Sequence, residues 1–158
     1  MADLVMQHDV GAYGSLRVLA GIAALVAGGA GNNAAVTGVT FDRAGFGNGS
    51  VANAAEIGLI YTADLSAGHT LSASYTVNTS DDGVTWTPCV PNATAVLATA
   101  AAAGGTVNGQ LNFPVDFTGA GRFIQLVYTP TLSATETDTA SVGAVGFFAG
   151  FDRLPAPL

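Results

Sequence analysis

The sequence predicts an all-β protein, an antiparallel β-sandwich of jelly-roll type with an extended or short-helical N-terminal arm. Apolar and polar residues alternate with a period of two in most segments after residue 35, as in strands with one buried and one solvated face. Turn-forming Gly, Asn and Asp residues recur about every ten residues. A chain of 158 residues is long enough to bury one core without cross-links.

The first 35 residues differ in composition from the rest of the chain. They are rich in Ala and Gly and contain few turn signals before residue 28. Four apolar residues lie near helical spacing: Leu16, Leu19, Ala23 and Val26. The Gly and Val content favours an extended segment instead, so both conformations stay open. We expect 1–35 to be an arm that contacts a partner or a neighbouring subunit, 36–153 to be the β-sandwich domain and 154–158 to be an extended, Pro-containing tail.

A β-hairpin is the clearest local prediction. Residues 70–78 alternate strictly, with Leu71 and Val77 on one face and hydroxyl and amide side chains on the other. The sequence Ser-Asp-Asp-Gly at 80–83 is typical of a tight turn. We expect 84–87 to return as the second strand, with Val84 and Trp86 on one face.

Other short segments with strand patterns follow the same rule. We expect them at 36–41, 56–62, 94–99, 111–117, 123–129 and 140–149. Pro114 cannot donate a ladder hydrogen bond, so its strand should be an edge strand or bulged. The segments 123–129 and 140–149 are the most apolar and should be central strands.

Composition excludes several classes of protein. Hydrophobic residues make up 49% and charged residues 9% of the chain, the formal net charge is −7, and there is no Lys. Four scattered Arg residues cannot form a nucleic-acid surface, and so apolar a chain is not disordered. One cysteine, Cys89, excludes a disulfide scaffold and a cysteine-based zinc site. The apolar stretch 18–30 is too short to span a membrane, and we expect a protein that is neither secreted nor membrane-bound.

Catalytic residues are scarce. His8 lies in the arm, and His69 lies in a loop. A triad of Ser72 or Ser74 with His69 and Asp64 is conceivable, but no Gly-x-Ser-x-Gly sequence supports it. We expect a solvated loop histidine, no enzyme activity, no cofactor, and no catalytic, cofactor-binding or metal site.

Other polar and aromatic residues also have structural interpretations. Asp81 and Asp82 could bind Ca²⁺, but adjacent carboxylates in a turn more often cap their own backbone. Cys89 has no basic neighbour and should be an inert thiol. The repeated Asp42-Arg43 and Asp152-Arg153 indicate local ion pairs. Four aromatic residues could form a carbohydrate platform, but their positions favour core packing: Tyr61, Tyr75, Trp86 and Tyr128.

The many small side chains of this sequence suit close packing against another protein. Thr, Ser, Ala and Gly lose little rotamer entropy when they become ordered, and an acidic surface avoids nucleic acid. These properties fit a component of a large assembly that lies beside packaged DNA without binding it.

Three stretches resemble a known family of virion proteins. They are Val36–Phe46, the hairpin Leu71–Trp86, and the segment from Val115 to Gly150 that contains Asp116-Phe117-Thr118-Gly119 and Thr129-Pro130-Thr131-Leu132. Together they resemble the head decoration, or capsid cement, proteins of tailed bacteriophages, over about residues 30–155. Because these are strand and turn patterns, the resemblance assigns no individual site residues.

The resemblance implies a protein of the outer capsid surface, assembled in the host cytoplasm. Such a protein binds the phage major capsid protein, often as a homotrimer, stabilises the head, and binds neither nucleic acid nor membrane. Deleting residues 1–30 should then weaken capsid binding and leave the β-domain folded. The alternatives are a carbohydrate-binding β-sandwich of a tail or adhesion structure, and a neck or tail subunit.

Overall fold

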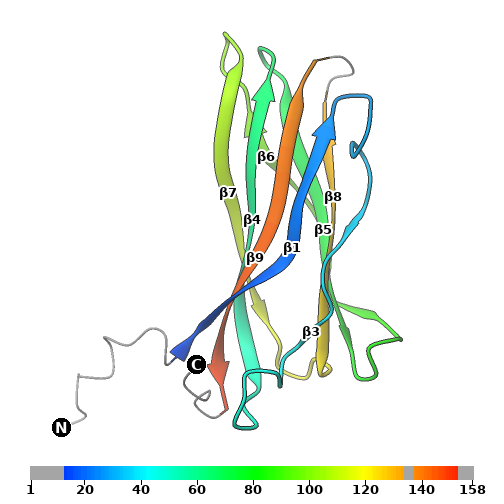
Figure 1. The fold of residues 1–158 in the computed structure, drawn as a ribbon, viewed down its shortest axis with the longest axis vertical. Helices are drawn as coiled ribbons and strands as arrows, with labels where there is room; N and C mark the ends of the chain where they lie inside the picture. The colour runs from blue at the N-terminus through cyan, green and yellow to red at the C-terminus, as the bar shows by residue number, and fades with distance from the viewer. Residues whose placement is uncertain (1–12, 134–136, 153–158) are drawn as a thin grey trace, which may run out of the picture.

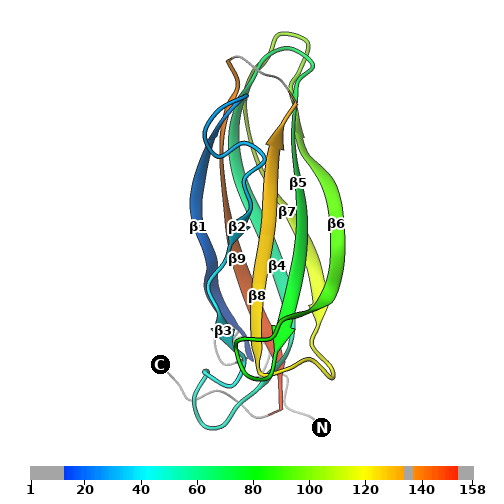
Figure 2. The same ribbon diagram turned by 90° about the vertical axis from the view of Figure 1, so that its right-hand side faces the viewer.

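Nine strands in two facing antiparallel sheets make up the described part of the chain (Figures 1 and 2). The computed structural model describes residues 13–133 and 137–152. The strands are β1 (Ser15–Val26), β2 (Val36–Thr37), β3 (Phe41–Asp42), β4 (Ala52–Leu65), β5 (Thr70–Ser80), β6 (Thr87–Thr99), β7 (Gly105–Asp116), β8 (Phe123–Leu132) and β9 (Thr139–Phe151). The predicted all-β antiparallel sandwich is confirmed, whereas the predicted tail 154–158, His8 and Arg153 lie outside the described residues.

The strand order places the predicted central strands correctly. One sheet has the order β1-β9-β4-β7, and the other has the order β2-β8-β5-β6, with β3 also paired to β8. The central positions of β8 and β9 are therefore confirmed. Pro114 lies in β7, an edge strand, opposite Glu56 of β4. An edge strand tolerates proline because one side of its backbone needs no ladder partner.

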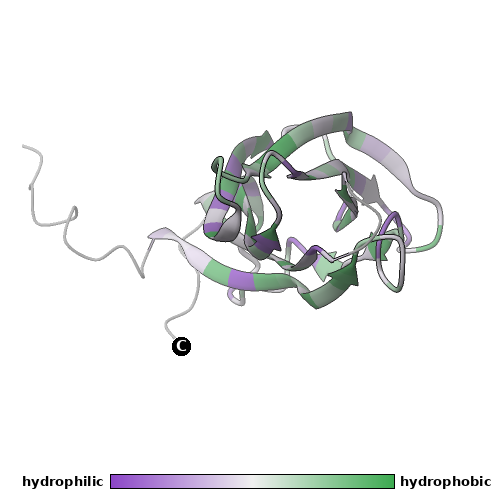
Figure 3. Ribbon diagram, turned by 90° about the horizontal axis from the view of Figure 1, so that it is seen from above, coloured by the Kyte–Doolittle hydropathy of each residue, from purple (hydrophilic) through white to green (hydrophobic). Residues whose placement is uncertain are grey.

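The core lies between the two sheets. In β8 every second residue from Ile124 to Leu132 is buried. Ile57 and Leu59 of β4 and Leu71 of β5 have no exposed surface. Viewed from above, the sheets curve around this shared interior (Figure 3). The predicted inward faces of β4 and β5 are thus confirmed.

The β5–β6 hairpin is confirmed, but its second strand starts later than expected. Thr79 pairs with Thr87, so the return strand begins at residue 87. Val84 is 79% exposed, and Trp86 is half-buried. The reason is Asp82, whose carboxylate accepts the backbone N–H groups of Val84 and Thr85 and keeps them out of the ladder.

Residues 15–26 are part of the sandwich, which corrects the expected boundary at residue 36. They form β1, which pairs with β9 along its length. Leu19 and Leu25 are 2% and 1% exposed, respectively. Two register shifts, between Val18 and Ala20 and between Ala20 and Ala23, interrupt the period of two. The interrupted period explains why the sequence pattern was compatible with both a helix and an arm.

The predicted strand 36–41 is split, and its middle joins the two sheets. Gly38 donates its backbone N–H to Leu126 of β8 (2.8 Å), and Val39 donates to Leu19 of β1 (2.8 Å). The close approach requires glycine, because a Cβ on Gly38 would lie 2.6 Å from the Leu19 carbonyl oxygen and 2.8 Å from that of Leu126. One side of the sandwich is closed by this segment.

Candidate functional site

The outward face of the four-stranded sheet is the most distinctive surface of the protein. Its side chains alternate with those of the core, and the strand register arranges them in rows across the sheet. We call this surface the outer sheet face. It consists of Leu16, Val18, Ile22, Ala24 and Val26 of β1; Thr139, Ser141, Gly143, Val145 and Phe147 of β9; Glu56, Gly58, Ile60, Thr62 and Asp64 of β4; and Thr106, Asn108, Gln110, Asn112, Pro114 and Asp116 of β7.

The outer sheet face changes from apolar to polar across its width. On β1, Leu16, Val18 and Ile22 are 64%, 65% and 76% exposed. The opposite edge, on β7, presents mainly amide and hydroxyl groups. Single exposed apolar residues are common on protein surfaces, but a contiguous row of large ones marks an interaction site.

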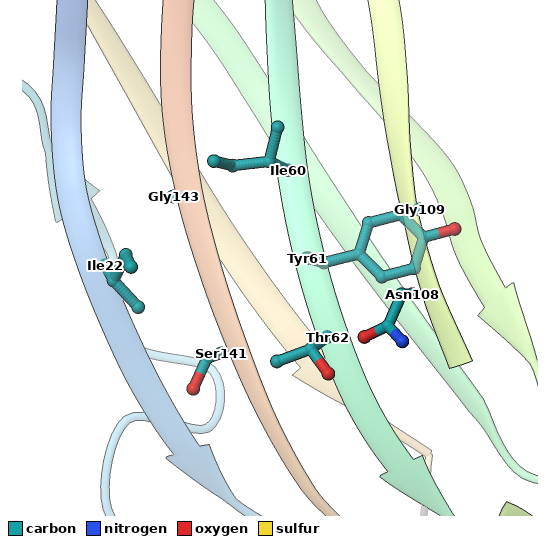
Figure 4. Close-up of a pocket in the computed structure, with 8 residues that line it drawn as sticks. All are labelled: Ile22, Ile60, Tyr61, Thr62, Asn108, Gly109, Ser141 and Gly143. Atoms are coloured by element: carbon teal, nitrogen blue, oxygen red, sulfur yellow. The ribbon is translucent and has the colours of Figure 1, made fainter. Parts of the chain in front are cut away.

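An apolar hollow lies in the middle of this face (Figure 4). It measures about 310 Å³ and is lined by Ile22, Ile60, Tyr61, Thr62, Asn108, Gly109, Ser141 and Gly143. Ile22 and Ile60 border Gly143 on its two sides, and a Cβ on Gly143 would lie 3.3 Å and 3.7 Å from their Cγ1 atoms. Because Gly143 has no side chain, its backbone forms the floor of the hollow between the two isoleucines.

A second hollow adjoins the first at the upper end of the sheet. It measures about 290 Å³, and Thr62 and Ser141 line both hollows. Its walls include Ala24 and Val26, and Asp64 is its single charged lining residue. The two hollows together offer an apolar floor with one carboxylate at the rim.

The described arginines are all engaged away from this face. Arg43 is buried and donates to backbone carbonyls. Arg122 pairs with Asp42 at 2.6 Å. The guanidinium of Arg17 lies 5.4 Å from the ring centre of Phe46. Within the described residues, no ion pair is formed by the three carboxylates of the outer sheet face, Glu56, Asp64 and Asp116.

At the upper end of the sandwich, His69 lies at ion-pair distance from Asp138. Its partner is therefore Asp138 and not Asp64, the acid of the triad considered from the sequence. His69 Nδ1 lies 2.7 Å from Asp138 Oδ2, and the Asp138 side chain is 1% exposed. Asp64 instead faces solvent on the outer sheet face. The Ser66 hydroxyl donates to the carboxylate and not to the imidazole, so the arrangement lacks the nucleophile–base contact that a triad requires.

His69 lies in the loop between β4 and β5, as expected, and its imidazole also contacts Asp138. The His69 side chain is 40% exposed, but it helps to hold Asp138. Burial raises the pKa of Asp138, but hydrogen bonds from Ser66 and His69 outweigh burial and hold the pKa below its ordinary value. Sequence reasoning missed this partner because Asp138 lies 69 residues away, immediately before β9.

At the lower end, Arg43 binds backbone carbonyls and not its sequence neighbour. Its guanidinium donates to the carbonyl oxygens of Ala52, Phe117, Ala120 and Gly121 at 2.6–3.1 Å. Asp42 pairs with Arg122, and Asp152 accepts the backbone N–H of Val51. The expected local Asp42–Arg43 pair is therefore wrong, because Asp42 and Arg43 point to opposite sides of the short strand end.

In the β5–β6 turn, the Asp82 side chain caps backbone N–H groups of the turn itself. Asp82 accepts hydrogen bonds from Ser80, Val84 and Thr85, and these bonds hold its pKa well below the usual range. In the described part of the chain, no three His, Cys, Asp or Glu side chains lie close enough to hold a metal ion. The capping interpretation of Asp82 is confirmed.

Cys89 is not an activated thiol. It is partly buried, its Sγ donates to the Val77 carbonyl at 3.2 Å, and burial raises its pKa. A raised pKa disfavours the thiolate that a nucleophile or metal ligand needs.

The tyrosine rings pack inward, as the alternation predicted. Tyr128 is 1% exposed and donates to the Val142 carbonyl at 3.0 Å. Tyr75 stacks on Phe113 at a centroid distance of 4.4 Å, and Tyr61 donates to the Leu97 carbonyl. These rings stabilise the sandwich and do not form a stacking platform for sugars. Among the residues described, no helix has the length and apolar character needed to cross a membrane.

Comparison with known proteins shows a shared fold. No family model and no curated protein sequence matches the chain. A structure of the infectious bursal disease virus Gx strain is similar with a TM-score of 0.50 and 14% identity, over 90% of this chain and 34% of that chain. The PBSX exported protein XepA is similar with a TM-score of 0.46 and 17% identity, over 91% of this chain and 39% of that chain. The chain spans about a third of the length of these structures, and at such identities the likeness is one of fold.

Proposed function

We propose that this chain is a non-enzymatic virion structural protein that binds the outer surface of a phage capsid and stabilises the head. The observation that carries the proposal is the outer sheet face, with its row of exposed aliphatic side chains and, among the described residues, no charges but three carboxylates. The resemblance of three sequence stretches to decoration proteins and the fold shared with a virus structure support the same function.

The energetics suit a protein that acts in many copies. Burying one Leu, Ile or Val side chain of β1 contributes about 1.5–3 kcal/mol, so a single small contact is weak. Copies joined as a trimer bind several capsid sites at once, and the high effective concentration of the linked sites raises the overall affinity. A shell covered by such trimers resists disruption because each trimer connects neighbouring capsid subunits.

Capsid binding tests the proposal directly. Shells assembled from the major capsid protein encoded in the same genome are mixed with the purified chain and sedimented. We expect saturable co-sedimentation and a higher temperature of shell disruption. A chain that does not bind shells contradicts the proposal, and binding to isolated necks or tails instead would make it a subunit of those structures.

The solution mass tests the trimer. Size exclusion coupled to light scattering should give three copies of the 15.7 kDa chain at micromolar concentration. A monomer in solution would contradict a preformed trimer and would require the trimer, if it exists, to form on the capsid. A dimer would contradict the three-fold arrangement.

A further inference from the structure

We propose that the outer sheet face docks onto a different protein, which inserts an apolar side chain into the first hollow and an adjacent lysine or arginine into the second. The inference rests on the proposed function, in which this partner is the capsid surface. It goes further by naming the face that binds and the pair of side chains that it recognises.

The first hollow suits one bulky apolar side chain. Its volume is about 310 Å³, its walls are Ile22 and Ile60, and its floor is the backbone of Gly143. Among the described residues, no charged side chain lines it. An aliphatic or aromatic side chain placed there would bury apolar surface on both partners without leaving a buried charge unpaired.

The second hollow suits a long basic side chain. Ala24 and Val26 supply apolar walls, and Asp64 supplies the carboxylate. Lysine and arginine lay their aliphatic stems along apolar surface while the charged end reaches a polar group. Because Thr62 and Ser141 line both hollows, the two inserted side chains would come from neighbouring positions on the partner.

Charge favours a different protein over a second copy of this chain. The chain has a net charge of −7, and the charged side chains of its outer sheet face, among the described residues, are the carboxylates of Glu56, Asp64 and Asp116. In the described part of the chain, each arginine is engaged elsewhere. Two copies that met through this face would bring like charges together with no cation from these arginines, so the partner must supply the positive charge.

The free edge of β1 directs the partner to the face of the sheet. An edge strand can recruit another strand through its unpaired backbone groups. Here the two register shifts bend β1, and Val39 already donates to the Leu19 carbonyl. These features hinder strand addition at the edge and leave the side chains of the face as the accessible surface.

Two pairs of matched variants test the inference on the assembled shells. Ile22→Asp places a charge on the first hollow, and Val96→Asp places one on a side chain of β6 that is 62% exposed. Asp64→Asn removes the rim carboxylate, and Asp81→Asn removes an exposed carboxylate at the opposite end of the molecule. All four sites are exposed, and circular dichroism and melting curves verify that each variant folds.

The expected result separates each variant from its control. Ile22→Asp should weaken shell binding at least tenfold, or about 1.4 kcal/mol, and Val96→Asp should bind like the wild type. Asp64→Asn should bind more weakly and lose part of the salt dependence of binding. Asp81→Asn should keep both the affinity and the salt dependence.

Other outcomes overturn the inference in distinguishable ways. If the wild type binds shells and Ile22→Asp binds equally well, the proposed function stands and the docking face is wrong. If Ile22→Asp lowers the mass of the free chain in solution, a second copy occupies the face and the inference is wrong. If the wild type does not bind shells, the proposed function fails and the inference fails with it.

Discussion

Two buried charged residues, Asp138 and Arg43, hold the loops at opposite ends of the sandwich. The Asp138 carboxylate accepts hydrogen bonds from Ser66 and His69, and its backbone carbonyl accepts the N–H of Ala27. It thereby joins the β1–β2, β4–β5 and β8–β9 connections. Arg43 does the same at the lower end, through four carbonyl oxygens.

Replacing Asp138 with Asn should destabilise the protein. The amide removes the charge and turns a donor toward at least one of the groups that now donate to the carboxylate. We expect the free energy of unfolding to fall by about 1–3 kcal/mol, measured by urea denaturation at pH 7. Asp64→Asn, on the exposed face, is the control and should change stability by less than about 0.5 kcal/mol.

The same variant predicts a pH dependence. The folded-state pKa of Asp138 lies below its ordinary value of 3.8, so its contribution to stability is fully present above that pH and is lost as the pH falls through the folded pKa. The stability difference between the wild type and Asp138→Asn should therefore be present at pH 5 and shrink as the pH falls below 3.8. A difference that grows on acidification would contradict this assignment.

Arg43 should matter far more than the exposed Arg122. Arg43→Met leaves four carbonyl oxygens of the lower loops without their donor, and we expect a loss of about 2–4 kcal/mol of unfolding free energy. Arg122→Gln breaks a solvent-exposed pair with Asp42 and should cost much less. Thermal melting of both variants measures how much stability each one loses. Equal losses would show that the four hydrogen bonds of Arg43 do not stabilise the fold more than the exposed Arg122–Asp42 pair.

At the scale of elements, the segment between β2 and β3 joins the two sheets. Gly38→Ala should destabilise the protein by about 1–3 kcal/mol, because the new Cβ must push the carbonyls of Leu19 and Leu126 apart. Gly21→Ala is the matched control, since a Cβ at Gly21 has no atom within 4 Å. Denaturant melts of the two variants should differ clearly, and a stable Gly38→Ala protein would show that the segment can move away.

The strand β1 belongs to the fold and cannot be removed as an arm. Deleting residues 1–30 takes away Leu19 and Leu25 and uncovers one side of β9, so we expect an unfolded or aggregated product. Deleting residues 2–12 leaves β1 and every core residue of the described part of the chain in place, and we expect this shorter chain to fold. Circular dichroism and light scattering distinguish the two, and a folded 1–30 deletion would restore the arm interpretation.

At the scale of the whole molecule, the topology pairs distant segments. β4 pairs with β9, so Ala52 lies opposite Phe151. Sheets with such non-local pairing fold in roughly milliseconds to seconds. We expect the main refolding phase in this range by stopped-flow fluorescence of Trp86, the single tryptophan, and a main phase of microseconds would contradict it.

Local pattern was sufficient wherever one strand face is buried without interruption. The alternation in β4 and β5, the turn chemistry of Asp82 and the missing N–H of Pro114 each depend on neighbours a few residues away, and they predicted the sandwich, the hairpin and the edge strand. The pattern failed for β1, because two register shifts change which residues of the strand face the core and so interrupt the alternation.

The sequence by itself determined the fold class, the hairpin and the low charge of the surface, because period, turn type and composition are local properties. Only the tertiary structure decided that Asp138 meets His69, that Arg43 binds four distant carbonyls, and that Ile22, Ile60 and Gly143 share one hollow. Each of these depends on which strands become neighbours. Which strands pair with which follows from packing of the whole core, and beyond the hairpin the local pattern indicated only that β8 and β9 are central and that β7 lies at an edge.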